Sequence, residues 1–151
     1  MKLLLTSLTV LLTTVNIYGQ STEDSVKATI NNLFASMKNA DQSLFKTVFS
    51  DNAILQTISR DKEGKTVVNS ESIQEFGDFI GKLKKDSADE RISFQTIKID
   101  GPLAMAWTPY NFYFNGKFSH CGVNSFQLVR LNGVWKIQYI IDTRRRAGCK
   151  P

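Results

Sequence analysis

Three dipeptides in the last third of the chain constrain its fold more than any other feature. Asp100-Gly101, Asn115-Gly116 and Asn132-Gly133 each separate long stretches rich in β-branched and aromatic residues. Such pairs favour two-residue primed turns, because both central residues must accept a positive φ. Together they predict a four-stranded antiparallel meander from about Glu90 to Thr143.

The earlier part of the chain carries helical periodicity instead. Apolar residues recur at helical spacing from about Thr22 to Asn39, which predicts an amphipathic helix. Asp41 is a good N-cap for a short second helix. Ser70 or Ser72 is expected to begin a third, and Ser72 has capping-box spacing to Glu75. Residues 53–59 and 66–69 are expected to be strands. Helices first and a long meander last predict an α+β fold, with three helices packed on one face of a strongly curved antiparallel sheet.

The first nineteen residues are expected to lie outside that domain. Lys2 gives a positively charged start, residues 3–15 form an apolar run, and the small residue Gly19 ends the segment. This pattern predicts a cleaved signal peptide, residues 1–19, before a single domain over residues 20–151. The apolar run is shorter than the roughly 20 residues that a transmembrane anchor needs. We therefore expect an exported protein, periplasmic or secreted, that does not stay in the membrane after cleavage.

The charge and motif content narrow the function classes. The formal net charge is +5, but basic and acidic residues alternate outside two clusters, Lys82, Lys84 and Lys85, and residues 144–146. We interpret both clusters as solvated surface; the alternative is contact with an anionic ligand, lipid or nucleic acid. No stacking-aromatic motif accompanies them, so no nucleic-acid partner is expected. Two cysteines and one histidine at these spacings do not make a zinc site, and no phosphate loop or dinucleotide fingerprint occurs. No metal and no cofactor are expected.

Two-residue turns would also fix the register of the meander and hence its faces. The core face is predicted to carry three rows: Phe94, Trp107, Asn124 and Ile141; Thr96, Met105, Phe126 and Tyr139; Leu103, Leu128 and Ile137. The opposite face is predicted to be more polar and to carry Arg91, Tyr110, Cys121, Asp142 and Arg144. A bulge would reverse part of this assignment. We expect one where Pro109 and Gly122 lie opposite each other.

Several segments of the meander resemble a known family. They are Trp107-Thr108-Pro109-Tyr110, Ser119-His120-Cys121-Gly122-Val123-Asn124, Trp135-Lys136-Ile137 and Asp142-Thr143-Arg144-Arg145. They look like the "putative lumazine-binding" family of the nuclear transport factor 2-like superfamily. The resemblance implies a cone-shaped fold with a pocket at its wide end, a bacterial envelope setting and a homodimer formed through the outer sheet face. Superfamily members include ketosteroid isomerases, dehydratases and SnoaL-like polyketide cyclases, so the resemblance does not fix a reaction.

The concave face is predicted to enclose a pocket for a small apolar or aromatic molecule. Its walls are assigned to Phe94, Met105, Trp107 and Phe126, with Asn124 and Tyr139 as central polar groups and Asn111 near the mouth. Alternatively, the aromatic residues only fill the core. Asn124 could instead bond a bulged backbone, since an unpartnered buried amide costs about 1–3 kcal/mol.

His120 is the one candidate for acid–base catalysis, because it is the only histidine and its ordinary pKa lies near neutrality. The projected register places it near the pocket mouth, beside Asn111. Asp142 is the nearest carboxylate in the sheet, but it is predicted on the opposite face, paired with Arg91 or Arg144. That placement argues against a His–Asp dyad and favours a structural role for His120.

Cys121 and Cys149 are predicted to form a disulfide, because an exported chain meets an oxidising compartment and Cys149 follows the last strand closely. The alternative is a buried thiol and an exposed one. Three function classes remain: a ligand-binding domain without catalysis, an isomerase-, dehydratase- or cyclase-like enzyme, and a homodimeric interaction module. The enzyme would use His120, with Tyr110 or Tyr139 as a further candidate. The sequence favours the first.

Overall fold

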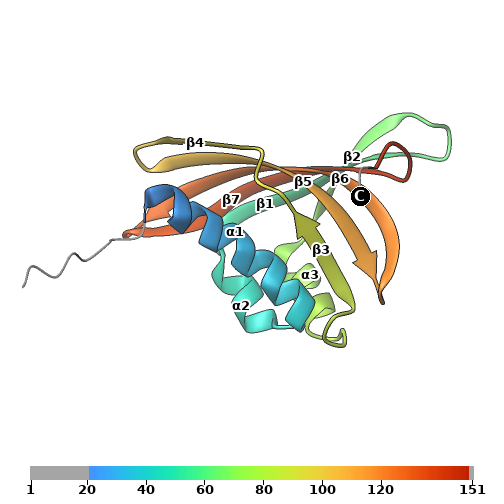
Figure 1. Cartoon of the computed structure of the whole chain (residues 1–151), viewed down its shortest axis with the longest axis horizontal. Helices are drawn as coiled ribbons and strands as arrows, with labels where there is room; N and C mark the ends of the chain where they lie inside the picture. The colour runs from blue at the N-terminus through green and yellow to red at the C-terminus, as the bar shows by residue number, and fades with distance from the viewer. Residues whose placement is uncertain (1–20, 150–151) are drawn as a thin grey trace, which may run out of the picture.

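The computed structural model describes residues 21–149, so the predicted signal peptide, residues 1–19, lies outside the described residues. Over the described range, three helices lie on one face of a curved sheet of seven strands (Figure 1). The predicted α+β arrangement of helices on a curved sheet is confirmed. The core lies between the helices and the concave face, where Phe34 of the first helix packs edge-on against Phe126, with ring centroids 6.2 Å apart.

Each helix begins at a side chain that caps its backbone. Helix α1 (Thr22–Asn39) begins after Ser21, whose Oγ accepts a hydrogen bond from the Asp24 backbone N–H. Helix α2 (Gln42–Thr47) is capped by Asp41 and helix α3 (Ile73–Ile80) by Ser72, as predicted. These caps satisfy backbone donors that the first helical turn leaves unpaired. One stripe of α1 is buried: Val26, Ile30, Leu33, Phe34 and Met37.

The sheet is larger than the predicted meander. Its strands are β1 (Phe49–Arg60), β2 (Thr66–Glu71), β3 (Ala88–Ile92), β4 (Thr96–Asp100), β5 (Leu103–Phe114), β6 (Lys117–Leu131) and β7 (Val134–Arg145). Their order is β2-β1-β7-β6-β5-β3, with β4 also on β5. The first predicted meander strand is therefore divided into β3 and β4. The expectation of a wholly antiparallel sheet is wrong at one pair, because β1 runs parallel to β7.

The turns form near the predicted dipeptides, but bulges change the register behind them. Asn115-Gly116 and Asn132-Gly133 are two-residue turns with positive φ at all four residues. The β5–β6 ladder then shifts by one residue at Ser119, and the β6–β7 ladder at Gln138. The third loop is Gly101-Pro102, one residue later than predicted, because Asp100 pairs with Leu103. The expected bulge at Pro109 and Gly122 is wrong, since the ladder continues there without a shift.

A one-residue shift moves every later side chain to the other face. On β5, Ala104, Ala106, Thr108 and Tyr110 are therefore buried, while Trp107 is 41% and Leu103 49% exposed. On β7, Ile140 and Asp142 are buried in place of the predicted Tyr139 and Ile141. The prediction of the core face is thus wrong for parts of β5 and β7. It is confirmed for Asn124, Phe126, Leu128 and Ile137.

Candidate functional site

A cavity of about 350 Å³ lies between the concave face of the sheet and helices α1 and α3. This volume falls within the range of small-molecule sites, which combine apolar walls with a few aimed polar groups. The apolar walls come from Leu33, Phe34, Met37, Leu55, Phe76, Phe79, Ile80, Ala88, Phe112, Phe114, Phe126 and Ile140. The polar groups are Glu71, Glu90, Tyr110, His120, Asn124, Asp142 and Arg144.

The polar residues that line the cavity are called its polar end below, and Asp142 accepts several of the hydrogen bonds there. Its Oδ2 accepts from the Tyr110 hydroxyl at 2.9 Å and from Arg144 Nε at 3.1 Å. Its Oδ1 accepts from the Thr57 hydroxyl at 2.5 Å, and Arg144 also donates to Thr57 Oγ1 at 2.9 Å. A buried carboxylate is stable only when such donors replace its water. Asp142 is therefore already satisfied by the protein.

Tyr110 reaches Asp142 because it lies opposite a glycine. A Cβ on Gly122 would lie 1.7 Å from the backbone oxygen of Thr143 and 2.7 Å from Tyr110 Cε1. The Tyr110 hydroxyl lies 3.0 Å from that same Thr143 oxygen. Burial, followed by the nearby carboxylates of Asp142 and Glu90, raises the pKa of Tyr110. The phenol therefore stays protonated and acts as a hydrogen-bond donor.

Glu90 is the second carboxyl group of the polar end, and it has a different environment. Its Oε1 accepts a hydrogen bond of 2.8 Å from Asn124 Nδ2. Burial raises the pKa of Glu90 to about 7, the negative charge of Asp142 acts in the same direction, and the Asn124 bond opposes them. Near neutral pH this carboxyl group can therefore either donate or accept a proton. Asn124 is partnered, so its burial needs no ligand.

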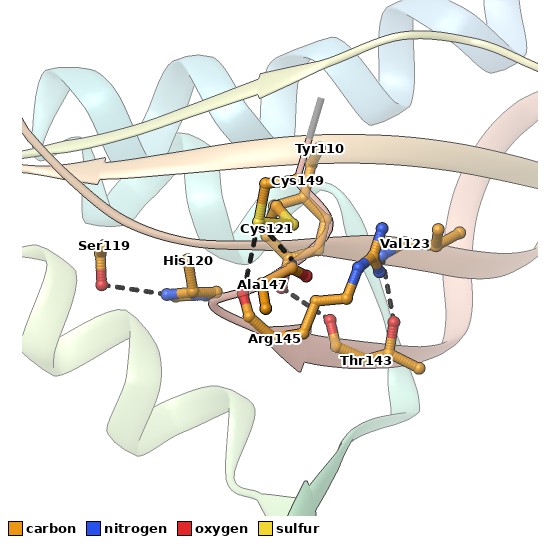
Figure 2. Close-up of a disulfide and its surroundings, with 9 residues drawn as sticks. All are labelled: Tyr110, Ser119, His120, Cys121, Val123, Thr143, Arg145, Ala147 and Cys149. Carbon is orange, nitrogen blue, oxygen red and sulfur yellow. Dashed lines mark hydrogen bonds between the residues drawn. A yellow bond between two sulfur atoms is a disulfide. The ribbon is translucent and has the colours of Figure 1, made fainter. Parts of the chain in front are cut away.

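His120 lines the same cavity, between the rings of Tyr110 and Phe112, at centroid distances of 5.8 Å and 5.1 Å. Its Nδ1 lies 3.0 Å from the Ser119 hydroxyl, as Figure 2 shows. Burial lowers the pKa of His120, and the positive charge of Arg144 adds to the effect. The imidazole is therefore neutral at neutral pH. Asp142 lies on this face too, so its predicted place on the opposite face is wrong.

Five predicted pocket residues lie outside the cavity. Met105 and Trp107 lie on the outer face of the sheet, beside Gln95 and Thr96. The Tyr139 hydroxyl donates to Gln56 Oε1 at 2.7 Å. Phe94 packs at the edge of the core, and its ring centroid lies 5.9 Å from the Lys27 ammonium. Asn111 lies between the inward-facing Tyr110 and Phe112 on β5, so it points to the opposite face. Their predicted place in the pocket is wrong. Register shifts move the four strand residues away from the cavity, and Phe94 lies between β3 and β4 at the edge of the core. Asn124, Phe126 and His120 do line the cavity.

The polar cavity residues that the sequence did not place in the pocket are Glu71, Glu90, Tyr110, Asp142 and Arg144, although Tyr110 was named as a possible catalytic group. Three of them were assigned to the outer face, because the bulges that turn them inward have no signature in the sequence. Their residue types were a usable signal. A carboxylate on β7 and a phenol on β5, on either side of β6 in an otherwise apolar sheet, require partners, and each can provide one for the other.

The predicted disulfide between Cys121 and Cys149 is present, with the two Cα atoms 5.7 Å apart (Figure 2). Cys121 is buried on β6, next to His120, and Cys149 follows the end of β7. The bond therefore holds the C-terminal segment against the sheet. It does so next to a residue that lines the cavity.

Residues 21–149 also bear on membrane insertion and metal binding. No helix in this range is long and apolar enough to cross a bilayer. Nor do three or more His, Cys, Asp or Glu side chains of this range gather closely enough to hold a metal ion.

Solved structures with this arrangement of helices and sheet are nuclear transport factor 2-like proteins. One of unknown function from Shewanella baltica is 18% identical, with a TM-score of 0.64, over 89% of this chain and 100% of that chain. Another of unknown function, from Methylobacillus flagellatus, is 19% identical, with a TM-score of 0.62, over 83% and 94% of the two chains. The chain therefore has the nuclear transport factor 2-like fold.

The sequence itself places the chain more narrowly. Residues 21–139 match the family described as "Putative lumazine-binding", and the chain belongs to this family. No curated protein matches it. The resemblance seen in the meander is thus confirmed.

Proposed function

We propose that the protein binds a small molecule in the cavity between the helices and the concave sheet. One observation carries this proposal: the cavity of about 350 Å³ combines aromatic walls with the Glu90–Asn124 pair at its polar end. Small-molecule sites have this composition. The family description supports a ligand that is a small molecule.

We further propose that the protein works outside the cytoplasm. The predicted signal peptide at residues 1–19 motivates this, and the Cys121–Cys149 disulfide supports it, because disulfides persist mainly in oxidising compartments. N-terminal sequencing of the protein recovered from the periplasm or medium of an expressing bacterium tests it. A chain that still begins at Met1 would contradict cleavage.

A ligand screen tests the binding function. The full-length protein, recovered after export, is screened by thermal shift and native mass spectrometry against pteridines, flavin precursors, sterols and short fatty acids. A binding compound should lose its effect with Phe112→Ala, which removes part of the cavity wall, and keep it with Trp107→Ala on the outer face. Equal loss with both variants, or loss only with Trp107→Ala, would contradict the site.

Acid–base catalysis of the isomerase, dehydratase or cyclase type is a second candidate. It is favoured by Glu90, because burial raises the pKa of this carboxyl group to about 7, where a general acid or base works best. His120 faces the same cavity as a neutral imidazole. Turnover of a ketosteroid or hydroxyketone that Glu90→Gln abolishes would support this candidate. Unchanged turnover in both Glu90→Gln and His120→Asn would exclude these two groups.

Homodimer formation through the outer sheet face stays a proposal. Several apolar side chains on this face are between 41% and 55% exposed, among them Ile54, Leu103, Trp107 and Val134. Light scattering on the wild type and on Leu103→Glu tests it. A wild-type monomer at micromolar concentration would contradict it.

A further inference from the structure

The charges that line the cavity differ in sign from those of the whole chain. The chain has a formal net charge of +5, yet the cavity is lined by three carboxyl groups, on Glu71, Glu90 and Asp142, and by one guanidinium, on Arg144. His120 adds no charge at neutral pH, because burial lowers its pKa. An apolar cavity with an excess of carboxyl groups attracts a cation and repels an anion.

These charges are not equally available to a ligand. Arg144 is paired with Asp142, which also accepts hydrogen bonds from Tyr110 and Thr57. Glu90 has no such partner: none of the ion pairs within residues 21–149 involves it. Its Oε1 accepts one bond, from the neutral amide of Asn124. Glu71 takes part in none of these ion pairs either, but it is exposed to solvent, which screens its charge. Glu90 is thus the less exposed carboxyl group of the cavity that no ion pair compensates.

The walls around Glu90 also suit a cation. Six phenylalanines line the cavity, from α1, α3, β5 and β6: Phe34, Phe76, Phe79, Phe112, Phe114 and Phe126. The face of an aromatic ring carries negative charge density and attracts an ammonium group within about 6 Å. The same rings give an apolar surface to the rest of a ligand.

Resting on the proposed ligand-binding function, we infer that the ligand is a small organic cation, an amine or quaternary ammonium with an apolar body, whose positive charge lies against Glu90. A protonated amine donates an N–H to the Glu90 carboxylate, whereas a quaternary ammonium, which has no N–H, is held there by charge alone. Asn124 bonds the same carboxylate. The apolar body lies among the phenylalanines, and the Asp142–Arg144 pair takes no direct part.

This arrangement predicts the direction of the pH dependence. A cation requires ionised Glu90, so affinity should rise with pH through the region near neutrality. The polar and titratable groups that line the cavity with Glu90 are Asp142 and Arg144 from β7, His120 and Asn124 from β6, Tyr110 from β5 and Glu71 from β2. A neutral ligand that accepts a proton from Glu90 would show the opposite trend, with affinity falling as pH rises.

Calorimetry with matched probes on the full-length exported protein tests the inference. The amines are tryptamine, 2-phenylethylamine and benzyltrimethylammonium; the neutral analogues are tryptophol, 2-phenylethanol and neopentylbenzene; the anion is indole-3-propionate. We expect at least one amine to bind tenfold or more tightly than its neutral analogue, a difference of about 1.4 kcal/mol. The anion should bind more weakly than either.

Two variants separate this inference from the proposed function. Glu90→Gln should abolish the preference for the amine while its binding of the neutral analogue persists, and Glu75→Gln, on the exposed side of α3, should change neither. If neutral analogues bind as well as amines in the wild type, the cation site is refuted and the binding function stands. If no amine binds at millimolar concentration although a neutral screening hit does, the inference fails alone. If nothing binds, both fail.

Discussion

Removing the Cys121–Cys149 disulfide is expected to lower the free energy of unfolding by about 3–4 kcal/mol. The bond closes a loop across 28 residues of sequence, which contains the β6–β7 hairpin. In the chain-entropy model, a loop of this length loses about 12 cal/mol/K of unfolded-state entropy, or about 3.6 kcal/mol at room temperature. The folded chain keeps its other contacts, because Cys149 lies beyond the end of β7.

Urea unfolding of wild type and the Cys121→Ala/Cys149→Ala double variant measures this difference. With a slope of about 1–3 kcal/mol per molar urea, the midpoint should fall by about 1–4 M. Reductant should lower the wild-type midpoint towards that of the variant and leave the variant unchanged. A difference below about 1 kcal/mol, or two titratable thiols in native protein that was never reduced, would refute the reasoning.

Three further predictions concern single residues of the sheet. Gly122→Ala should destabilise the fold by about 3 kcal/mol or more and change the near-UV signal of Tyr110, because a Cβ would lie 1.7 Å from the Thr143 oxygen. A stable variant with unchanged spectra would contradict the close contact. Since burial raises the pKa of Glu90 from 4.5 to about 7, the folded state holds a proton that the unfolded chain releases over this pH range. The free energy of unfolding of the wild type should therefore fall by about 2–3 kcal/mol as pH rises through this range, and that of Glu90→Gln should not. Equal pH dependence of the free energy of unfolding in the two proteins would argue against a raised pKa of Glu90. Thr108→Val should be neutral or stabilise by about 1 kcal/mol, because no described residue bonds the buried Thr108 hydroxyl; a marked loss in urea unfolding would reveal a bond to that hydroxyl.

The sequence predicts the elements of this fold well, because local chemistry determines where they begin and end. The periodic apolar stripe of α1, the caps Asp41 and Ser72 and the two Asn-Gly turns all act within a few residues. Register is different. It depends on single extra residues, Ser119 and Gln138, whose side chains do not mark them as bulges. The parallel β1–β7 pair could not be read from local patterns either, since the two strands are far apart in sequence.

Strand register also explains which residues of the site were predicted correctly from the sequence. Asn124, Phe126 and His120 were placed correctly because β6 kept its predicted face, although His120 pairs with Phe112 and not with the predicted Asn111. Trp107 and Tyr139 were predicted to line the pocket, but Tyr110 and Asp142 line it instead. A register shift of one residue reverses which side chains of a strand face the core. Glu90 could not be recognised, because its significance comes from the cavity that surrounds it.

A crystal structure of the protein with its tightest ligand from the screens tests the central claim most directly. The account predicts ligand density inside the cavity, within hydrogen-bond distance of the Glu90 carboxyl group and in contact with Phe112. Ligand density on the outer face beside Trp107, with the cavity filled by protein side chains, would contradict it.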